Sequence, residues 1–126
     1  MTAVTAIIVG AGHRAQVYAE YAQTAPDQLK IVGVADPDVK RRQQLAERFG
    51  FSDEMCFENA EELAARGRLA DVIINGTMDQ DHVATAIPLL AVGYDMLLEK
   101  PMAIDEEEMF RLYEAACRNE SKVMIC

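Results

Sequence analysis

The sequence lacks the features that mark several classes of protein. It has no tryptophan, and no apolar run approaches the ~20 residues that a membrane-spanning helix needs. Its three cysteines, Cys56, Cys117 and Cys126, are widely spaced and include no C-x-x-C pair, so they predict free thiols in a reducing compartment. His13 and His82, the only histidines, add no metal-ligand spacing to them, and we predict no metal site.

Positive charge is also scarce. The chain has 12 Lys and Arg against 21 Asp and Glu, a formal net charge of −9. Such a field repels polyanions, so we predict neither nucleic acid nor a membrane surface among the partners. No basic leader precedes the first apolar run, and we therefore expect a cytoplasmic protein.

What the sequence does have is a regular alternation of short apolar runs and amphipathic segments. The apolar runs cover residues 4–9, 31–35, 55–57, 72–74, 96–98 and 123–125. Several are continuously apolar, as in strands that are buried on both faces, and helical spacing or capping patterns fill the segments between them. The order predicts an α/β fold of the Rossmann type. We expect a doubly wound, mainly parallel six-stranded sheet in the order 3-2-1-4-5-6, as a single domain.

Two helix predictions are specific enough to be checked directly. Pro88 removes one backbone donor from the apolar segment 82–92, so we expect a kink or an early break there. Asp105 followed by Glu108 predicts the start of a last helix. The side chains expected on its buried stripe are Met109, Leu112, Tyr113 and Ala116.

The strongest local motif is G-x-G-x-x-A, which runs from Gly10 to Ala15. It follows a predicted strand directly and opens a predicted helix, the context that a dinucleotide-binding fingerprint requires. Gly10 allows the tight turn, Gly12 has no β-carbon to obstruct a pyrophosphate, and Ala15 lets the helix approach the sheet. The helix N-terminus then faces the phosphates. A plain strand-to-helix turn is the alternative interpretation of this short motif.

Asp36 ends the second predicted strand and lies 24 residues after Gly12, close to the ~20 residues expected for the acid that binds an adenosine ribose. A carboxylate at that place favours NAD, because it repels a 2′-phosphate. The following Lys40-Arg41-Arg42 could neutralise such a phosphate, so NADP stays open. Sheets that bind a methyl donor show the same two signals.

Polar segments follow the next two strands. Residues 75–82 come after the run 72–74, and Glu99-Lys100-Pro101 comes after the run 96–98. Ligands bind at the carboxyl ends of strands in such sheets, beside the point where the strand order reverses. A proline keeps the preceding residue extended, so Lys100 can point into that crevice. An ordinary surface lysine is the alternative.

Together these motifs resemble a known family. They are Gly10-x-Gly12-x-x-Ala15, Asp36 with Arg41, Thr77-x-Asp79-x-x-His82 and Glu99-Lys100-Pro101. In this order they are similar to the nucleotide-binding domain of the Gfo/Idh/MocA oxidoreductases, the glucose–fructose oxidoreductase and inositol dehydrogenase superfamily. The resemblance covers essentially the whole chain, and the Glu-Lys-Pro triplet is its most specific part.

The resemblance implies a role for each matching residue. Four residues, Gly10, Gly12, His13 and Arg14, would surround the pyrophosphate, mostly through backbone groups. Asp36 would hold the adenosine ribose, and Arg41 would lie near the adenine. Thr77 and His82 would line the path to the nicotinamide, and Glu99, Lys100 and Pro101 would lie at its ribose. Lys100 would also be catalytic, stabilising an alkoxide that develops on the substrate. The family's loop usually reads Thr-Pro-Asn-x-x-His, whereas Met78 and Asp79 follow Thr77 here. This departure weakens the expectation of the usual sugar substrate.

The resemblance further implies a larger enzyme. Residues 1–126 would be the NAD(P)-binding domain, and the C-terminal domain with the substrate pocket and the acid–base residue would be absent. We expect the full-length protein to be an NAD(P)-dependent dehydrogenase that moves hydride between nicotinamide and a hydroxyl-bearing carbon of a sugar, cyclitol or related small molecule. The chain alone should bind NAD, or NADP, but turn over poorly or not at all.

Partners and alternative functions follow from the same resemblance. A small polyol-like or sugar-like substrate is the expected partner, and a homo-oligomer is left open. A non-catalytic dinucleotide-sensing module of the same fold is one alternative function. An NAD-using glycosidase of the same family is the other. Lys100 favours either enzyme over the sensing module.

Overall fold

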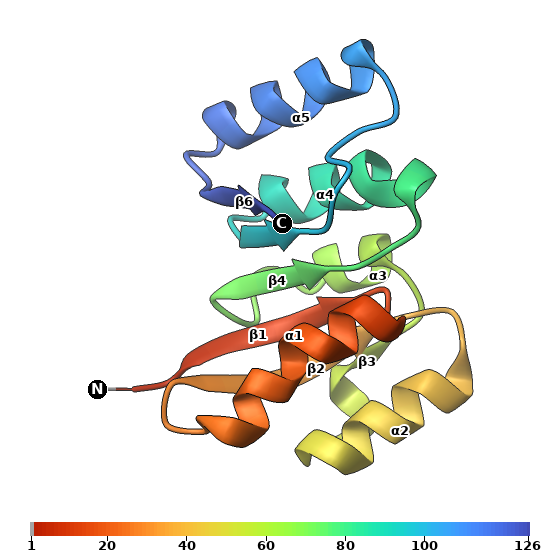
Figure 1. Ribbon diagram of the computed structural model, residues 1–126, viewed down its shortest axis with the longest axis vertical. Helices are drawn as coiled ribbons and strands as arrows, with labels where there is room; N and C mark the ends of the chain where they lie inside the picture. Colours follow the sequence, from red (N-terminus) through yellow and green to blue (C-terminus); the bar gives the residue numbers. More distant parts are fainter. Residues whose placement is uncertain (1) are drawn as a thin grey trace.

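Strands and helices alternate along the residues that the structure describes, 2–126, in a computed structural model (Figure 1). The strands are β1 (Val4–Val9), β2 (Leu29–Ala35), β3 (Cys56–Phe57), β4 (Val72–Asn75), β5 (Asp95–Leu98) and β6 (Val123–Ile125). The helices are α1 (His13–Thr24), α2 (Val39–Phe49), α3 (Ala60–Ala64), α4 (His82–Ala91) and α5 (Glu106–Arg118), with 3₁₀ turns η1 (Asp53–Met55) and η2 (Asp79–Asp81).

All six strands form one parallel sheet in the order β3-β2-β1-β4-β5-β6. The predicted Rossmann-type architecture and strand order are therefore confirmed. β1 and β4 lie side by side at the centre, with Ile7 opposite Ile73 and Ile8 opposite Ile74. The chain winds outward from this pair in both directions, so the strand order reverses between them.

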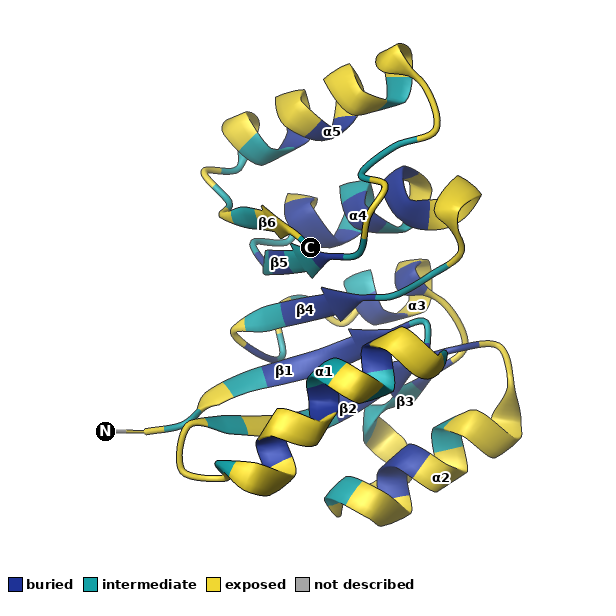
Figure 2. Ribbon diagram, viewed as in Figure 1, coloured by how far each residue is buried: buried dark blue, intermediate teal, exposed yellow. Residues whose placement is uncertain are grey.

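Helices cover both faces of the sheet, which explains why the central strands are continuously apolar. Ile7, Ile73 and Met96 point toward the face covered by α3, α4 and α5 and belong to one core cluster. Ile8 and Ile74, their neighbours in sequence or register, point toward the face with α1 and α2. Figure 2 shows the resulting pattern, a buried sheet centre with helices buried on their inner sides.

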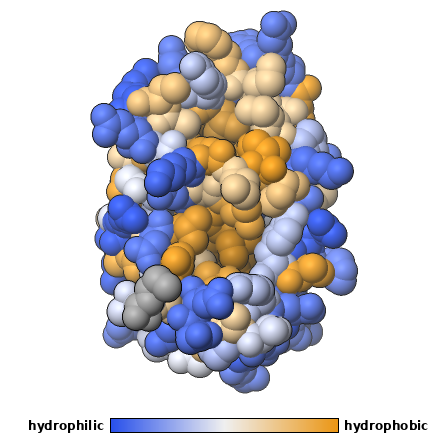
Figure 3. All heavy atoms as spheres, turned by 60° about the vertical axis from the view of Figure 1, so that its left-hand side comes forward, coloured by the Kyte–Doolittle hydropathy of each residue, from blue (hydrophilic) through white to orange (hydrophobic). Residues whose placement is uncertain are grey.

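One part of the sheet has less cover. A shallow hollow of about 560 Å³ lies against β1, β4, β5 and β6, and its apolar lining includes Val4, Val72, Leu97 and Met124. Figure 3 shows a hollowed apolar area on this side of the molecule. Within residues 2–126, no helix combines the length and the apolarity that crossing a bilayer requires.

The predicted helix starts are confirmed, but two details are wrong. The Asp105 side chain accepts a hydrogen bond from the Glu108 N–H at 2.8 Å and caps α5. The stripe expected on α5 is correct for Leu112 and Ala116, which pack in or against the core, and wrong for the other two residues. Met109 and Tyr113 are 42% and 64% exposed and lie away from the core beside the edge strand β6. Of the kink or early break expected at Pro88, the break does not occur, since α4 runs unbroken from residue 82 to residue 91.

Burial explains why α4 tolerates its proline. A proline inside a helix costs about 3 kcal/mol, whereas each large apolar side chain that is fully buried contributes about 1.5–3 kcal/mol. Val83, Leu89 and Leu90 are all buried from this one helix. The packing of α4 therefore outweighs the lost hydrogen bond.

The parallel sheet brings the polar segments to one edge. β1, β2, β4 and β5 all end there, and Gly10, Asp36, Gly76 and Glu99 are the residues that follow them. Residues that are distant in the sequence thus meet at the carboxyl ends of neighbouring strands, beside the point where the strand order reverses.

Candidate functional site

The turn after β1 depends on the absence of a side chain at Gly10. This residue has a φ of +80°, and a β-carbon there would lie 2.6 Å from the backbone nitrogen of Thr77. Its N–H donates to the Ala35 carbonyl at 2.8 Å, which ties the turn to the end of β2. The turns after β1 and β4 therefore touch, and only glycine fits at the contact.

Gly76 makes the matching contact from the other side. A β-carbon on Gly76 would lie 2.8 Å from the β-carbon of Ala15 in α1. The small side chain expected at Ala15 is therefore needed against the turn that follows β4. No motif in the sequence indicated Gly76, because its partner lies about 60 residues away and neither residue alone forms a motif.

Gly12 is different, because the space above it is open. It is the N-cap of α1, and a β-carbon there would meet no atom within 4 Å. The first turn of α1 has no acidic side chain, and His13 and Arg14 beside it are exposed. This helix N-terminus is therefore accessible to an anion that approaches its N–H groups.

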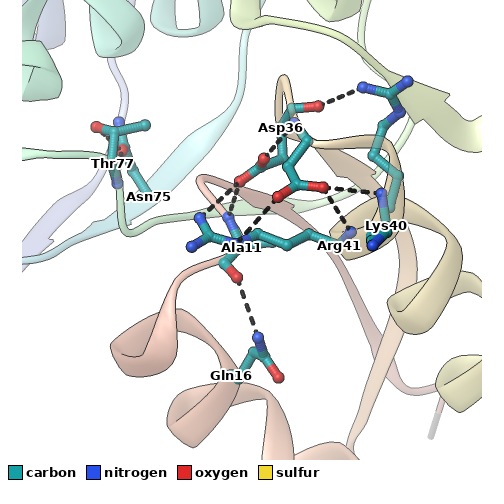
Figure 4. A network of polar contacts seen from close by, with 9 residues as sticks. Ala11, Gln16, Asp36, Lys40, Arg41, Asn75 and Thr77 are labelled. Carbon is teal, nitrogen blue, oxygen red and sulfur yellow. Dashed lines mark hydrogen bonds and ion pairs between the residues drawn. The ribbon is translucent and has the colours of Figure 1, made fainter.

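Asp36 lies in the floor of the site and is 4% exposed. One carboxylate oxygen accepts from the Ala11 N–H at 2.8 Å, and the other accepts from the Asp38 N–H at 2.8 Å (Figure 4). The carboxylate thus links the glycine turn to the turn after β2. The spacing of Asp36 from Gly12 predicted a ribose contact only, and nothing in it indicated this bond between the two turns.

The three cations after Asp36 do not act together. Arg42 donates to the backbone carbonyl of Asp36 at 2.6 Å. The Arg41 guanidinium lies 3.8 Å from the Asp36 carboxylate and 3.9 Å from that of Asp38. Two carboxylates already face Arg41, and Arg42 is engaged by the backbone, so the basic run is a weaker phosphate site than its sequence suggests.

These residues enclose a recess of about 200 Å³. It is lined by Gly10, Gly12, Asp36, Pro37, Arg41, Gly76, Thr77, Met78 and Asp81. A second hollow of about 240 Å³ shares Gly10, Pro37, Thr77 and Asp81 with it and extends toward α3. The structure therefore brings five of the predicted site residues to a single concave surface.

Glu99, at the end of β5, is held by side chains of α1. The Tyr18 hydroxyl donates to its carboxylate at 2.6 Å, and the Arg14 guanidinium lies 3.7 Å from it. Arg14 also donates to the Tyr18 hydroxyl at 3.2 Å. Arg14 was expected at the pyrophosphate mostly through its backbone, and its side chain turns toward Glu99. No motif indicated Tyr18, whose partner is far away in the sequence.

The Tyr18 hydroxyl remains a donor over the working pH range. Hydrogen bonding with the Cys126 side chain and with the Glu99 carboxylate raises the pKa of Tyr18 to about 12. Both neighbours disfavour the phenolate form, because it would place negative charge beside them. The bond from Tyr18 to Glu99 is therefore retained at neutral pH.

Lys100 lies in the turn after β5, and His82 contacts that turn at Pro101. His82 was expected to line the path to the nicotinamide, and in the structure it is 0% exposed. Its Nε2 lies 2.9 Å from the Thr77 carbonyl oxygen, and its Nδ1 lies 2.5 Å from the Pro101 carbonyl oxygen. Lys100 is exposed, and within residues 2–126 no carboxylate lies within the 4.0 Å of an ion pair with it.

The arrangement has the parts that a dinucleotide requires: an open helix N-terminus at Gly12, a buried carboxylate at Asp36 and, at Lys100, a cation that forms no ion pair among the described residues. Within the described residues, 2–126, no three His, Cys, Asp or Glu side chains gather closely enough to hold a metal ion. A nicotinamide cofactor fits these observations, because the recess is built from glycine backbone where phosphates approach and carries the acid where a ribose would lie. Fold and site together define a dinucleotide-binding Rossmann domain.

Comparison with known proteins places the domain more narrowly. Residues 4–126 match the model of the oxidoreductase family with an NAD-binding Rossmann fold, Gfo/Idh/MocA. The chain belongs to this family, as its motifs predicted, and is an NAD(P)-binding domain of the oxidoreductase type. It is 30% identical over 118 residues to the rhizopine catabolism protein MocA of Rhizobium meliloti, with 94% of this chain and 35% of that protein covered.

Solved structures confirm the fold. The WlbA dehydrogenase of Chromobacterium violaceum, in complex with NADH and UDP-GlcNAcA, superposes with a TM-score of 0.90 at 21% identity. That match covers 100% of this chain and 35% of WlbA. Biliverdin reductase of Synechocystis, in complex with biliverdin and NADP+, gives a TM-score of 0.82 at 23% identity and covers 97% of this chain and 37% of that one. The chain thus spans about a third of the length of these relatives.

Proposed function

We propose that this chain is the cofactor-binding domain of a dehydrogenase that prefers NAD to NADP. In the longer protein it would move hydride between the nicotinamide and a hydroxyl-bearing carbon of a sugar, cyclitol or related small molecule. The observation that carries the proposal is the buried Asp36 carboxylate in the floor of the recess beside Gly12. Lys100, which forms no ion pair among residues 2–126, lies at the end of a neighbouring strand.

Asp36 supplies the preference for NAD. An ionised carboxylate offers about four lone-pair sites, and backbone N–H groups of Ala11 and Asp38 occupy one on each oxygen. The remaining sites can accept from the two hydroxyls of an adenosine ribose. A 2′-phosphate would instead meet a fixed negative charge, which Arg41 offsets only in part because it also faces Asp38.

Gly12 and the first turn of α1 provide the phosphate position. The N–H groups at a helix N-terminus and the helix dipole both favour an anion. Gly12 leaves their approach open, and no acidic side chain in that turn competes with a phosphate. His13 and Arg14 flank the approach as exposed side chains.

Lys100 is the residue that we assign to the reaction itself. A bound nicotinamide would supply the hydride acceptor or donor. The Lys100 ammonium, which has no carboxylate partner within residues 2–126, would stabilise negative charge on the substrate oxygen. His82 cannot act as the proton acceptor, since both of its ring nitrogens lie against backbone carbonyls and the ring is buried. That acceptor would come from the rest of the longer protein.

The relatives support a small hydroxyl-bearing substrate. The UDP-GlcNAcA in the WlbA complex is a sugar nucleotide. An oxidoreductase of Agrobacterium radiobacter binds L-tartaric acid together with NAD+. Because Met78 and Asp79 replace the family's usual residues after Thr77, the proposal extends to the class of hydroxylated small molecules and not to one sugar.

Calorimetric titration tests the cofactor assignment. The 126-residue chain should bind NAD+ at one site. It should bind NADP+ about tenfold more weakly, the effect of losing one charge-assisted contact. Equal affinity for the two cofactors would contradict the role of Asp36, and no heat with either one would contradict the site.

Turnover in the longer protein tests the assignment of Lys100. The substitution Lys100→Met should lower turnover far more than it lowers NAD+ affinity, because the ammonium acts on the reacting oxygen. Unchanged turnover would remove Lys100 from the reaction and favour a sensing role for the domain.

A further inference from the structure

The buried ring of His82 contacts two separate turns of the site. Its Nε2 lies 2.9 Å from the carbonyl oxygen of Thr77, in the turn after β4. Its Nδ1 lies 2.5 Å from the carbonyl oxygen of Pro101, in the turn after β5. His82 itself opens α4 and is 0% exposed, so water does not compete for either contact.

Each of these turns carries a residue of the proposed site. Thr77 lines the recess beside Asp36, and the Asn75 side chain holds Thr77 by accepting from its N–H at 3.2 Å and from its hydroxyl at 2.8 Å. Pro101 follows Lys100 directly. The ring of His82 therefore lies between the turn that borders the adenosine recess and the turn that carries the proposed catalytic lysine.

The chemistry of the two contacts is the same. A carbonyl oxygen only accepts, so each contact requires an N–H on the ring. A neutral imidazole carries one N–H and a protonated imidazole carries two. Substitution can remove the two contacts one at a time. Asparagine places an amide near the Nδ1 position, and glutamine places one near the Nε2 position.

We propose that His82 is a positioning residue that holds the Lys100–Pro101 turn against the Thr77 turn and so sets where Lys100 faces the cofactor. That His82 sets where Lys100 faces the cofactor, the functional half, rests on the proposed dehydrogenase role. That His82 holds the two turns together, the structural half, does not. His82→Gln should keep the donor to Thr77 and release Pro101. His82→Asn should keep the donor to Pro101 and release Thr77.

Two backbone amides report on these contacts without any cofactor. The Met78 amide shares its peptide group with the Thr77 carbonyl, and the Met102 amide shares one with the Pro101 carbonyl. In nuclear magnetic resonance spectra of the free chain, His82→Gln should shift the Met102 amide resonance and leave that of Met78 in place. His82→Asn should do the reverse, and His82→Leu should shift both.

A side chain that only fills space would not give this crossed pattern. If both amides move together in the glutamine and asparagine variants, or if neither moves, the proposal is overturned. Urea unfolding of each variant checks that the fold persists. If the asparagine and leucine variants do not fold, the glutamine variant alone tests the proposal, which predicts that its Met102 amide resonance shifts and its Met78 amide resonance does not.

Cofactor binding tests the functional half. His82→Gln should weaken NAD+ binding about fivefold, the effect of one hydrogen bond, and leave the affinity for ADP unchanged, because ADP does not reach Lys100. An equal loss of affinity for NAD+ and for ADP would overturn the role of His82 in placing Lys100. If the unaltered chain binds NAD+ no better than ADP, the proposed contact between the nicotinamide half and the Lys100 turn fails instead, and the amide shifts still decide whether His82 joins the two turns.

Discussion

Asp36 and Glu99 are both carboxylates that directly follow parallel strands, at opposite ends of the proposed cofactor site, and the protein holds them by different means. Asp36 accepts from two backbone N–H groups at 2.8 Å, those of Ala11 and Asp38. Glu99 is held by side chains, the Tyr18 hydroxyl at 2.6 Å and the Arg14 guanidinium at 3.7 Å. The adenosine end is thus built from the backbone, and the nicotinamide end from side chains.

The two ends also differ in shape. The adenosine end is a recess of about 200 Å³ that includes Gly12, Asp36 and Thr77. Neither this recess nor the hollow beside it is lined by Glu99 or Lys100. At the end built from the backbone, stability and NAD+ binding should depend on glycine and on turn geometry. At the end built from side chains, NAD+ binding should change with conservative substitutions that leave the fold intact.

The largest effect is expected at Gly10. Gly10→Ala should lower the free energy of unfolding by about 3 kcal/mol, because the new β-carbon meets Thr77 backbone at 2.6 Å in a conformation with positive φ. Urea unfolding followed by circular dichroism measures the change. Gly12→Ala is the matched control, since its β-carbon meets nothing within 4 Å. It should keep the stability and lose NAD+ affinity, and a stable Gly10→Ala protein would contradict the close contact between the two turns.

The next largest effect is expected at Asp36. Asp36→Ala should weaken NAD+ binding about tenfold or more, the effect of losing a charge-assisted contact, and should narrow the difference between NAD+ and NADP+. The Ala11 and Asp38 N–H groups would also lose their acceptor, at a cost of about 1–2 kcal/mol in stability. Calorimetry and urea unfolding separate the two effects. Unaltered selectivity in a folded variant would exclude Asp36 as the residue that discriminates the cofactors.

A smaller loss of NAD+ affinity is expected at the end that contains Glu99. Tyr18→Phe removes the donor to Glu99 and should weaken NAD+ binding a few-fold while leaving ADP binding unchanged, because ADP lacks the nicotinamide half. Tyr21→Phe is the control, since Tyr21 lies on the same helix as Tyr18 and its hydroxyl donates at 2.6 Å to Gln28, which lies outside that helix and away from the site. Parallel titrations with both ligands measure the difference. Equal losses of NAD+ and ADP in Tyr18→Phe would show that the two ends are not separate.

The smallest effect is expected far from both ends, at Asp71. Hydrogen bonds from the backbone N–H and the hydroxyl of Thr5 lower the pKa of Asp71 from its ordinary value of 3.8. A depressed pKa in the folded state adds stability above pH 3.8, and this stability is lost as the pH falls through the folded pKa. Urea midpoints at about pH 7 and about pH 3 should therefore differ less in Asp71→Asn than in the unaltered chain. NAD+ affinity at neutral pH should stay the same in this variant.

The sequence predicted the backbone-built end better than the other. Gly10, Gly12 and Asp36 lie at spacings that a strand, a turn and a helix dictate locally, and the strand order followed from the alternation of elements. No motif predicted a role for Gly76 or Tyr18, because each contacts a partner in a distant segment of the sequence. No periodicity encodes such a contact before the sheet has formed.

The helical pattern of α5 predicted a wider buried stripe than the structure has, because few elements pack against this helix. The spacing of Met109 and Tyr113 indicates a buried stripe, but α5 is the last helix on its face and lies beside the edge strand β6, so both side chains remain exposed. Five residues after β4 and β5 were predicted to bind the cofactor, namely Thr77, His82, Glu99, Lys100 and Pro101. That assignment stays a proposal, and the burial of His82 means that its ring lies beneath the surface of the site.

The most direct test of the central claim is a crystal structure of the chain with NAD+ bound. We predict the diphosphate at the open N-terminus of α1 beside Gly12, and the adenosine ribose hydroxyls within hydrogen-bond distance of the Asp36 carboxylate. A dinucleotide bound anywhere else, or a ribose that leaves Asp36 bonded only to its backbone partners and Arg41, would contradict it.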